Sequence, residues 1–272
     1  MIARSWLFCP GERTDRLAKA VGVADVAVAD LEDAVHAERK DAARTAVTEA
    51  LRADPAAARR TWVRINNDGV HTRADLDALA GLEFAGIVVP KASAESMREV
   101  AARSSVPLLA LVETAAGLWD AAKIAAGERV VTVTLGEYDL AVELGVARPD
   151  VDDEPLAWAR SRVVAAAAAA GCAPPPAPVS SVIEDTGRYR ADTGRLGRFG
   201  FFGRMCIHPR QVEVVHEVLR PGDEEVAAAS SVVRAAEDAE RTGATVLIVD
   251  GRLVDPPVVH HAHRILALAE RG

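Results

Sequence analysis

Charged side chains recur in this sequence where apolar runs end. Glu113 closes the run that starts at Pro107, and Asp139 follows the run that starts at Val130. A charged group next to an apolar run is costly unless it is paired or binds a metal, so this recurrence predicts a shared polar site. Two carboxylates, completed by waters and a substrate oxygen, suit Mg²⁺. The alternative is that each carboxylate caps a helix or pairs with a nearby cation.

Further charged residues follow the neighbouring runs. The planar guanidinium of Arg64 can bind two oxygens of a carboxylate or an enolate at once. The alternative for this residue is a buried ion pair with Asp30 or Glu32. We expect a supporting group to hold the metal and its waters in place and to pair with the cations. Its predicted members are Asp30, Glu32, Asp33 and Lys91.

A local basic stripe contrasts with the acidic average of the chain. Arg13, Arg16 and Lys19 recur every three residues after the first apolar run. An anionic phosphate group would be drawn to such a stripe, and the alternative is a solvated helix face. His208 stands between Ile207 and a proline. A lone histidine in this position is more often structural than a base.

These residues need a scaffold that brings the ends of the runs together. Eight short runs are apolar at nearly every position, as is typical of parallel strands covered on both faces, and stretches with helical spacing separate them. This alternation predicts a (β/α)8 TIM barrel, in which the C-terminal ends of the strands surround the active site. The alternative is a doubly wound open sheet, which the absence of GxGxxG after the first run disfavours. The runs are Ser5–Cys9, Val26–Leu31, Thr61–Asn66, Gly86–Pro90, Pro107–Glu113, Val130–Gly136, Ala177–Val182 and Arg204–His208.

The C-terminal part of the chain breaks this pattern. We predict a barrel over residues 1–210 and a helical and hairpin extension over residues 211–272. The extension is expected to pack on a neighbouring subunit or to cover an active site, and the alternative is that it only adds stability. Its predicted elements are helices at Gln211–Arg220, Asp223–Arg241 and Val258–Ala269, with a hairpin joining Thr245–Val249 to Leu253–Val254.

Composition narrows the class of protein. The 272 residues are 50% hydrophobic and carry a formal net charge of −8, which argues against disorder and against a dedicated nucleic-acid binder. No run approaches the roughly 20 apolar residues of a membrane helix, and no secretory signal is evident. The three cysteines form neither a disulfide framework nor a zinc site. We therefore expect a cytoplasmic protein without nucleic-acid or membrane partners.

Taken together and in order, the motifs resemble the HpcH/HpaI aldolase and citrate lyase beta-subunit superfamily, and within it the CitE-like branch. The resemblance spans nearly the whole chain and implies a (β/α)8 barrel that breaks or forms carbon–carbon bonds with Mg²⁺, or with Mn²⁺ in its place. It rests on Leu7–Arg13, Asp30–Val35, Val63–Asn66, Pro90–Lys91, Leu111–Thr114, Gly136–Leu140, Cys206–Gln211 and Asp250–Val258.

The resemblance also implies roles for particular residues. Glu113 and Asp139 match the metal ligands, and Arg64 matches the residue that holds the oxo acid or stabilises the enolate. Asp255 matches the acid/base residue, delivered by a neighbouring subunit of a homotrimer or hexamer. The residues that fall where the family holds the CoA end and the thioester are Phe8, Arg13, Arg16, Lys19, Ile207 and His208.

The expected activity is a lyase that cleaves a 3-hydroxyacyl-CoA, or forms it by Claisen condensation, with a 2-oxo acid or acetoacetate as the other partner. Malyl-CoA, citramalyl-CoA and 3-hydroxy-3-methylglutaryl-CoA are the candidate thioesters. The alternatives are a citrate lyase beta subunit acting on a carrier-protein citryl thioester, a pyruvate-dependent class II aldolase, and a non-catalytic subunit. The chain departs from the family pattern at Glu137 and Tyr138, and the stretch Pro174–Asp185 matches poorly.

Overall fold

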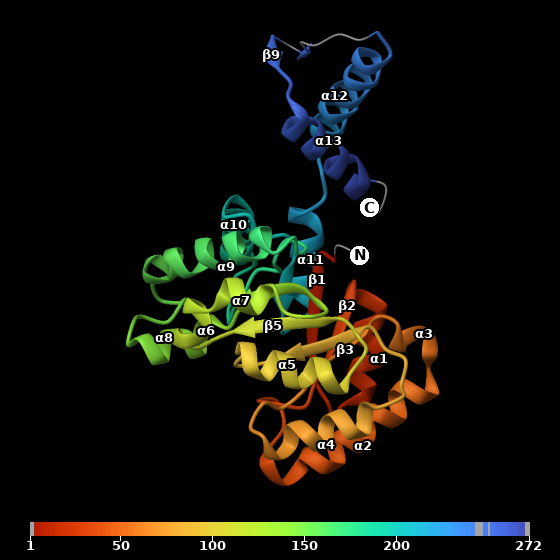
Figure 1. Cartoon of the computed structure of the whole chain (residues 1–272), viewed down its shortest axis with the longest axis vertical. Helices are drawn as coiled ribbons and strands as arrows, with labels where there is room; N and C mark the ends of the chain where they lie inside the picture. Colours follow the sequence, from red (N-terminus) through yellow and green to blue (C-terminus); the bar gives the residue numbers. More distant parts are fainter. Residues whose placement is uncertain (1–2, 243–246, 250, 270–272) are drawn as a thin grey trace. The chain divides into compact units, whose positions relative to one another are not determined.

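The structure is a computed structural model that describes residues 3–242, 247–249 and 251–269. The chain divides into two compact units, residues 1–218 and residues 219–272 (Figure 1). Helix α11, Pro209–Val218, therefore lies in the first unit, where it packs against β1 and β7. None of the described helices is both long enough and apolar enough to cross a membrane.

The first unit is built on a parallel sheet of seven strands in the order β6-β5-β4-β3-β2-β1-β7. Four of the strands, β2, β4, β5 and β7, are buried at every position, as strands covered on both faces must be. Because all strands run the same way, their C-terminal ends share one edge of the sheet. The strands are β1 Ser5–Pro10, β2 Val26–Asp30, β3 Thr61–Arg64, β4 Gly86–Val89, β5 Leu108–Val112, β6 Val130–Leu135 and β7 Arg204–Cys206.

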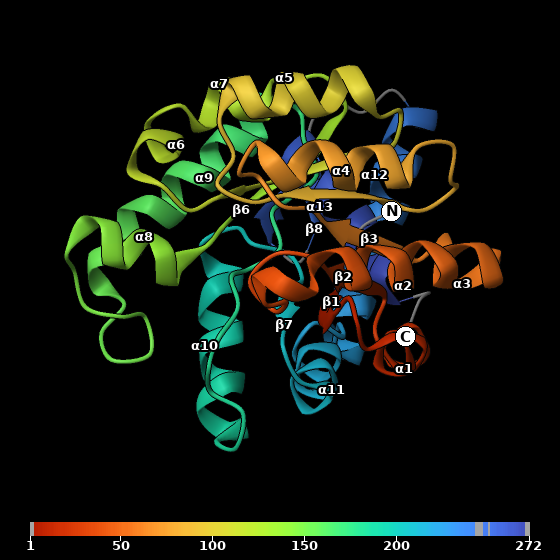
Figure 2. The ribbon, with the colours of Figure 1, turned by 90° about the horizontal axis from the view of Figure 1, so that it is seen from below.

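Helices surround this sheet and alternate with its strands (Figure 2). In α5 the predicted apolar face, Met97, Val100 and Ala101, is buried, and Ser93 caps the helix by accepting from the amide of Ser96. Short 3₁₀ turns lie at Ala37–Arg39 and Glu154–Leu156. Besides α11, the helices of this unit are α1 Thr14–Val23, α2 Lys40–Ala53, α3 Pro55–Ala58, α4 Val70–Leu79, α5 Ala94–Arg103, α6 Ala115–Trp119, α7 Ala121–Ala125, α8 Glu137–Leu144, α9 Ala157–Ala169 and α10 Thr186–Arg198.

The predicted strand at Ala177–Val182 is wrong. In this segment only Ala177 forms a bridge, an isolated parallel one with Arg204. The three prolines at 174–176 lack an N–H and cannot donate to a ladder, so the chain passes β6 with irregular bonding. There the Thr134 hydroxyl donates to the carbonyl of Pro176 at 2.6 Å. The structure is an α/β fold with a seven-stranded half-barrel sheet, and eight regular strands are not confirmed.

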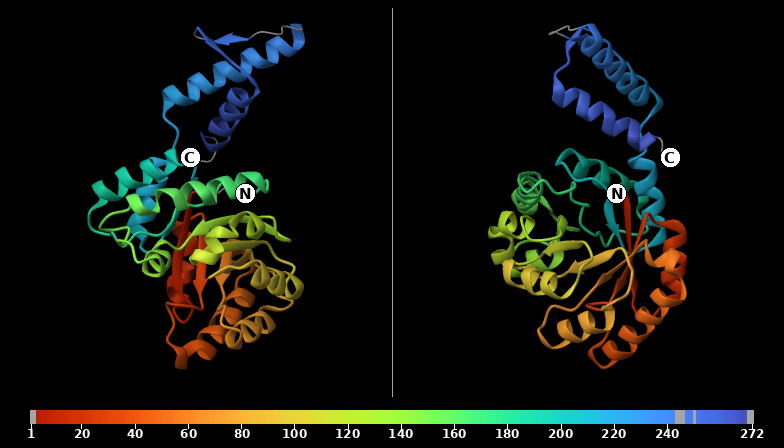
Figure 3. Two further views of the ribbon diagram at one scale, coloured as in Figure 1. Left: turned by 60° about the vertical axis from the view of Figure 1, so that its left-hand side comes forward. Right: turned by 45° about the vertical axis from the view of Figure 1, so that its right-hand side comes forward.

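The second unit is a pair of helices joined by a short hairpin, as the sequence predicted. Helices α12, Asp223–Thr242, and α13, Pro256–Ala269, lie side by side (Figure 3). Strands β8, Ile248–Val249, and β9, Arg252–Leu253, pair antiparallel, while residues 245, 246 and 250 of the predicted hairpin region lie outside the described residues. Among the described residues of this unit, the buried core cluster is small and contains Ala229, Val233, Ala262 and Ile265.

Candidate active site

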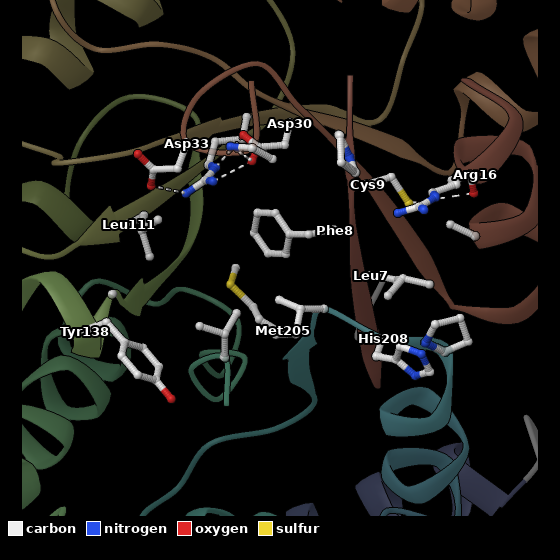
Figure 4. A pocket seen from close by; sticks show the side chains of 18 of the residues that line it. Leu7, Phe8, Cys9, Arg16, Asp30, Asp33, Leu111, Tyr138, Met205 and His208 are labelled. Carbon is white, nitrogen blue, oxygen red and sulfur yellow. Dashed lines mark hydrogen bonds and ion pairs between the residues drawn. The ribbon is translucent and has the colours of Figure 1, made fainter. Parts of the chain in front are cut away.

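A cavity of about 1120 Å³ opens at the C-terminal edge of the sheet in the first unit (Figure 4). Residues from the ends of β1, β2, β3, β5, β6 and β7 line it, so the sheet brings together residues that are far apart in sequence. Most of the residues predicted from the sequence lie here. They are Phe8, Arg16, Lys19, Asp30, Asp33, Arg64, Glu113, Asp139, Ile207 and His208.

Glu113 follows β5 and is buried. Its Oε1 accepts a hydrogen bond of 2.6 Å from the amide of Lys91. Gly136 leaves the room that this carboxylate needs, because a Cβ at position 136 would lie 2.6 Å from the Cβ of Glu113 and closer still to its Oε2. Burial raises the pKa of Glu113 to about 7, and the carboxylates of Glu32 and Asp139 act in the same direction.

Lys91 connects the carboxylates of the site. Its backbone takes a positive φ of 45°, which is uncommon for a residue with a Cβ and presents its amide to Glu113. Its Nζ donates to Glu32 Oε1 and lies 3.7 Å from Asp139 Oδ2. Asn67, which the sequence analysis missed, holds this turn by donating to the Lys91 carbonyl at 3.2 Å.

Arg64 is held by the acidic residues that follow β2. Its Nε and Nη2 donate to the two oxygens of Asp30 at 2.7 and 2.6 Å, and its Nη1 lies 2.9 Å from Glu32 Oε2. Burial alone lowers the pKa of Arg64, but these carboxylates raise it above its usual range. The guanidinium also lies over the Phe8 ring, 5.2 Å from its centre. The ion pair considered as an alternative is therefore present.

The connected cluster carries excess negative charge. Its two cations, Arg64 and Lys91, face five carboxylates, so the formal sum is 2 − 5 = −3. Within the described residues no group of three or more His, Cys, Asp or Glu side chains is arranged to hold one metal ion. A divalent cation here would thus take two carboxylates and complete its shell with water or substrate oxygens, a donor set that fits Mg²⁺. The carboxylates are Asp30, Glu32, Asp33, Glu113 and Asp139.

The predicted basic stripe divides at the start of α1. Arg13 pairs with Asp15 at 2.8 Å and does not line the cavity. Arg16 and Lys19 do line it, and their side chains make no hydrogen bond or ion pair with the described part of the chain. The cavity therefore has two cations free to attract an anion on one flank and a carboxylate cluster on another.

Two further predicted residues have local structural contacts. His208 Nδ1 accepts from the amide of Arg210 at 3.2 Å at the start of α11, so this histidine helps to cap the helix. Asp255 belongs to the second unit, is exposed, and accepts from the amide of Val258 at 3.2 Å at the start of α13. Asp255, Glu32, Lys91 and Arg13 are not among the residues that line the cavity.

Sequence analysis missed a buried ion pair beside the site. Glu137 opens α8, and both of its oxygens accept from the guanidinium of Arg160 on α9. The sequence could have indicated this pair, because Arg160 is one of only two charged residues in the Ala-rich stretch of α9. An arginine on an apolar helix face predicts a buried partner.

The parallel half-barrel and the carboxylate cluster at the C-terminal ends of its strands are typical of α/β enzymes whose active site lies at that edge of the sheet. Residues 4–209 match the sequence profile of HpcH/HpaI aldolase/citrate lyase, and the chain belongs to this family. The predicted family and the predicted class of enzyme, a lyase, are confirmed.

Relatives of known sequence match over almost their full length. The chain is 40% identical over 270 residues to a citrate lyase subunit beta-like protein of Mycobacterium tuberculosis, covering 97% of this chain and 94% of that protein. It is 36% identical over 272 residues to a (3S)-malyl-CoA thioesterase of Cereibacter sphaeroides, covering 98% and 94%.

Solved structures agree with this assignment. The crystal structure of CitE from Mycobacterium tuberculosis, in complex with magnesium, acetoacetate and coenzyme A, superposes with a TM-score of 0.82 at 36% identity, covering 99% of this chain and 98% of that one. A citrate lyase beta subunit of the same organism, with oxaloacetate and magnesium, superposes with a TM-score of 0.72 at 37% identity, covering 81% and 98%.

Proposed function

We propose that the chain is a Mg²⁺-dependent carbon–carbon lyase that cleaves a 3-hydroxyacyl-CoA, or forms it by Claisen condensation. The observation that carries this proposal is the cluster with a formal charge of −3, most of whose members line the same cavity as Arg16 and Lys19. The side chains of these two cations have no bonding partner among the described residues. Such a cavity suits a divalent cation together with a phosphorylated cofactor. The CitE structure that holds magnesium, acetoacetate and coenzyme A supports this combination.

Glu113 and Asp139 would hold the metal, with Mn²⁺ as a substitute for Mg²⁺. The fit rests on the space that Gly136 leaves beside Glu113, and on the burial and neighbouring carboxylates that raise the pKa of this carboxyl and that a bound cation would offset. When bound, Mg²⁺ supplies Lewis-acid chemistry that lowers the pKa of the substrate hydroxyl and polarises the carbonyl it becomes. Lys91, Asp30, Glu32 and Asp33 support the two carboxylates and Arg64.

The other residues bind and stabilise the reacting parts. Cleavage passes the proton of the 3-hydroxyl to solvent, breaks the carbon–carbon bond and leaves a thioester enolate, whose charge Arg64 stabilises. The protonated Asp255 carboxyl, delivered by a second copy of the chain, gives its proton to the enolate carbon and takes up another from solvent. Arg16 and Lys19 attract the CoA phosphates, with Arg13 beside them. The thioester arm lies along Phe8, Ile207 and His208.

A screen of CoA thioesters tests this proposal. Purified protein with Mg²⁺ is offered malyl-, citramalyl- and 3-hydroxy-3-methylglutaryl-CoA, and the products are identified by mass spectrometry. Cleavage to a shorter acyl-CoA with a 2-oxo acid or acetoacetate, abolished by a chelator, is expected. Cleavage that persists with chelator present contradicts the proposal. Activity only on a carrier-protein citryl thioester would point to a citrate lyase subunit instead.

The same screen separates a second candidate activity. The malyl-CoA thioesterases at 36% identity favour hydrolysis of the thioester. Hydrolysis releases free CoA and the intact hydroxy acid, whereas the lyase releases a shorter acyl-CoA. The ratio of free thiol to acyl-CoA therefore distinguishes the two reactions.

We further propose a homotrimer or hexamer in the cytoplasm in which Asp255 acts on the site of another copy. Light scattering should give three or six times the mass of the chain. Inactive Asp255→Asn and inactive Glu113→Gln proteins, dissociated and reassembled together, should regain activity, because some sites then combine an intact metal pair with an intact Asp255. If the mixed protein reassembles without regaining activity, Asp255 does not act on the site of another subunit.

We also propose that the sheet closes as a (β/α)8 barrel with an irregular eighth segment. This proposal is supported by backbone hydrogen bonds that connect residues 173–177 to β6 on one side and to β7 on the other. The amide of Ala173 donates to Val131 at 2.9 Å, and the amide of Met205 donates to Ala177 at 2.9 Å. A crystal structure that shows residues 173–177 detached from either strand would contradict closure.

A further inference from the structure

We infer that Glu137 and Arg160 form a positioning pair that fixes the first turn of α8 and thereby sets Asp139 opposite Glu113. This inference rests on the metal site of the proposed function. Neither residue has a role in the reaction as described above. The start of α8 is also held by the bond from the Gly136 amide to Val112 and by the Tyr138 hydroxyl, which accepts from the Ser181 amide, but the pair with Arg160 is the buried ionic contact of this turn.

The pair is buried and fully bonded. The side chains of Glu137 and Arg160 are only 3% and 2% exposed. Arg160 Nε and Nη2 donate to the two carboxylate oxygens at 2.6 and 2.7 Å. Two parallel charge-assisted bonds fix the orientation of both planes, and no bulk water is present to replace them.

Glu137 stands at a sensitive point of the chain. It follows Gly136, where an added Cβ would clash with Glu113, and it precedes Asp139 by two residues in the same helical turn. No side chain caps this end of α8. Asp139 itself is 47% exposed, and its ion pair to Lys91 is long at 3.7 Å. The position of Asp139 therefore depends on the backbone of the turn, which the Glu137–Arg160 pair anchors to α9.

The Glu137–Arg160 pair is the first link in a series of ion pairs between alternating acidic and basic side chains. Arg160 Nη1 donates to Asp153 at 2.6 Å, and the series reaches β7 at Arg204, which is buried and stacks 4.2 Å over the ring of Tyr189. It therefore crosses the side of the sheet where the predicted strand is missing. Side-chain ion pairs there join α8 to β7. The order of the series is Glu137, Arg160, Asp153, Arg195, Asp192 and Arg204.

Two variants of the pair test this role. Arg160→Lys keeps the charge but loses the paired bonds. The double variant Glu137→Gln, Arg160→Gln removes both buried charges, so it keeps the inference testable if the poorer geometry of the lysine pair prevents folding of Arg160→Lys. Arg4→Met is the matched control, because it breaks the ion pair of Arg4 with Asp25 at the N-terminal ends of β1 and β2, away from the cavity.

The readout is Mn²⁺ affinity measured by electron paramagnetic resonance, together with the thermal midpoint and the Mg²⁺ dependence of activity. Both pair variants should bind Mn²⁺ about tenfold more weakly, as residues that orient metal ligands do. The control should lose thermal stability and keep its Mn²⁺ affinity. Wild-type affinity in either folded pair variant overturns the inference, and so does an equal loss in the control. A wild-type protein that binds no Mn²⁺ instead removes the proposed metal site.

Discussion

At the scale of single residues, Glu113 is the most unusual group of the site. Its carboxylate is buried, accepts one amide hydrogen bond, and lies among other carboxylates. Desolvation and like charges both favour its neutral form. A bound cation reverses this preference, so protonation and metal binding compete at the same atoms.

This competition predicts how stability depends on pH. The pKa of Glu113 is about 7 in the folded protein and near 4.5 in the unfolded chain, so the folded state binds more protons between these values. The free energy of unfolding of the metal-free protein should therefore fall as pH rises through this window, by up to about 3 kcal/mol. Urea denaturation in the presence of a chelator at pH 5 and pH 8 measures the change.

The control is Glu113→Gln, which has no proton to lose at this site. Its stability should change less over the same pH range, and added Mg²⁺ should stabilise only the wild-type protein at pH 8. An identical pH dependence in the two proteins would show that Glu113 does not titrate in this way.

Lys91 gives a second prediction at this scale. Its φ of 45° strains any residue with a Cβ. Lys91→Gly and Lys91→Met both remove the ammonium group, but only glycine relieves the backbone. The glycine variant should be more stable than the methionine variant by about 1 kcal/mol, measured by chemical denaturation. Equal stability would mean that the turn is not strained.

At the scale of elements, the close approach of β5 to the start of α8 determines the site. Gly136→Ala places a methyl group against the Glu113 carboxylate. We expect a loss of roughly 1–3 kcal/mol in stability, as overpacking causes, and a Mn²⁺ affinity at least tenfold weaker. Denaturation and Mn²⁺ titration measure the two effects.

Gly197→Ala is the matched control. Gly197 lies in α10, and its added Cβ would meet no atom within 4 Å. This variant should gain about 0.5–1 kcal/mol from the better helix propensity of alanine and bind Mn²⁺ as the wild type does. If both alanine variants bind Mn²⁺ normally, the space beside Glu113 is not required.

Sequence predicted the elements better than their contacts. The seven strands fall within one residue of the predicted apolar runs at their N-terminal ends, because continuous apolar runs of this length fold as buried parallel strands. The run at Ala177–Val182 was misleading, since the prolines before it prevent a ladder. Lys91 and Glu113 were both singled out, but the bond between them depends on a positive φ that residue type does not reveal. Likewise, the spacing of the basic residues does not reveal that Arg13, just before α1, pairs with Asp15, whereas Arg16 and Lys19 within α1 line the cavity.

At the scale of the whole molecule, the two units divide the proposed chemistry. The carboxylate cluster and the cavity lie in residues 1–218, and Asp255 lies in residues 219–272. The first unit contains the seven-stranded sheet and its surrounding helices, whereas the core cluster of the second has four buried residues among those that the structure describes. A domain with its own core can fold alone.

This division predicts the result of truncation. Residues 1–218 alone should fold with a cooperative thermal transition and bind Mn²⁺ with wild-type affinity, but cleave no thioester because Asp255 is missing. Circular dichroism, Mn²⁺ titration and the thioester screen measure these properties, and full-length Asp255→Asn should match the truncated protein in activity. Cleavage by the truncated protein would show that Asp255 is not the acid.

The missing strand has a consequence for how this protein can change over time. Residues 179–182 are held mainly through their backbone, since Gln211 Nε2 donates to the carbonyls of Ser180 and Val182 at 2.9 Å each and the Tyr138 hydroxyl accepts from the amide of Ser181. Val179 lines the cavity. Backbone bonds do not depend on residue type, so substitutions in residues 180–182 can leave these bonds and the strand ladders in place. The segment thus gives evolution a place to alter the lining of the cavity while the proposed catalytic groups keep their positions.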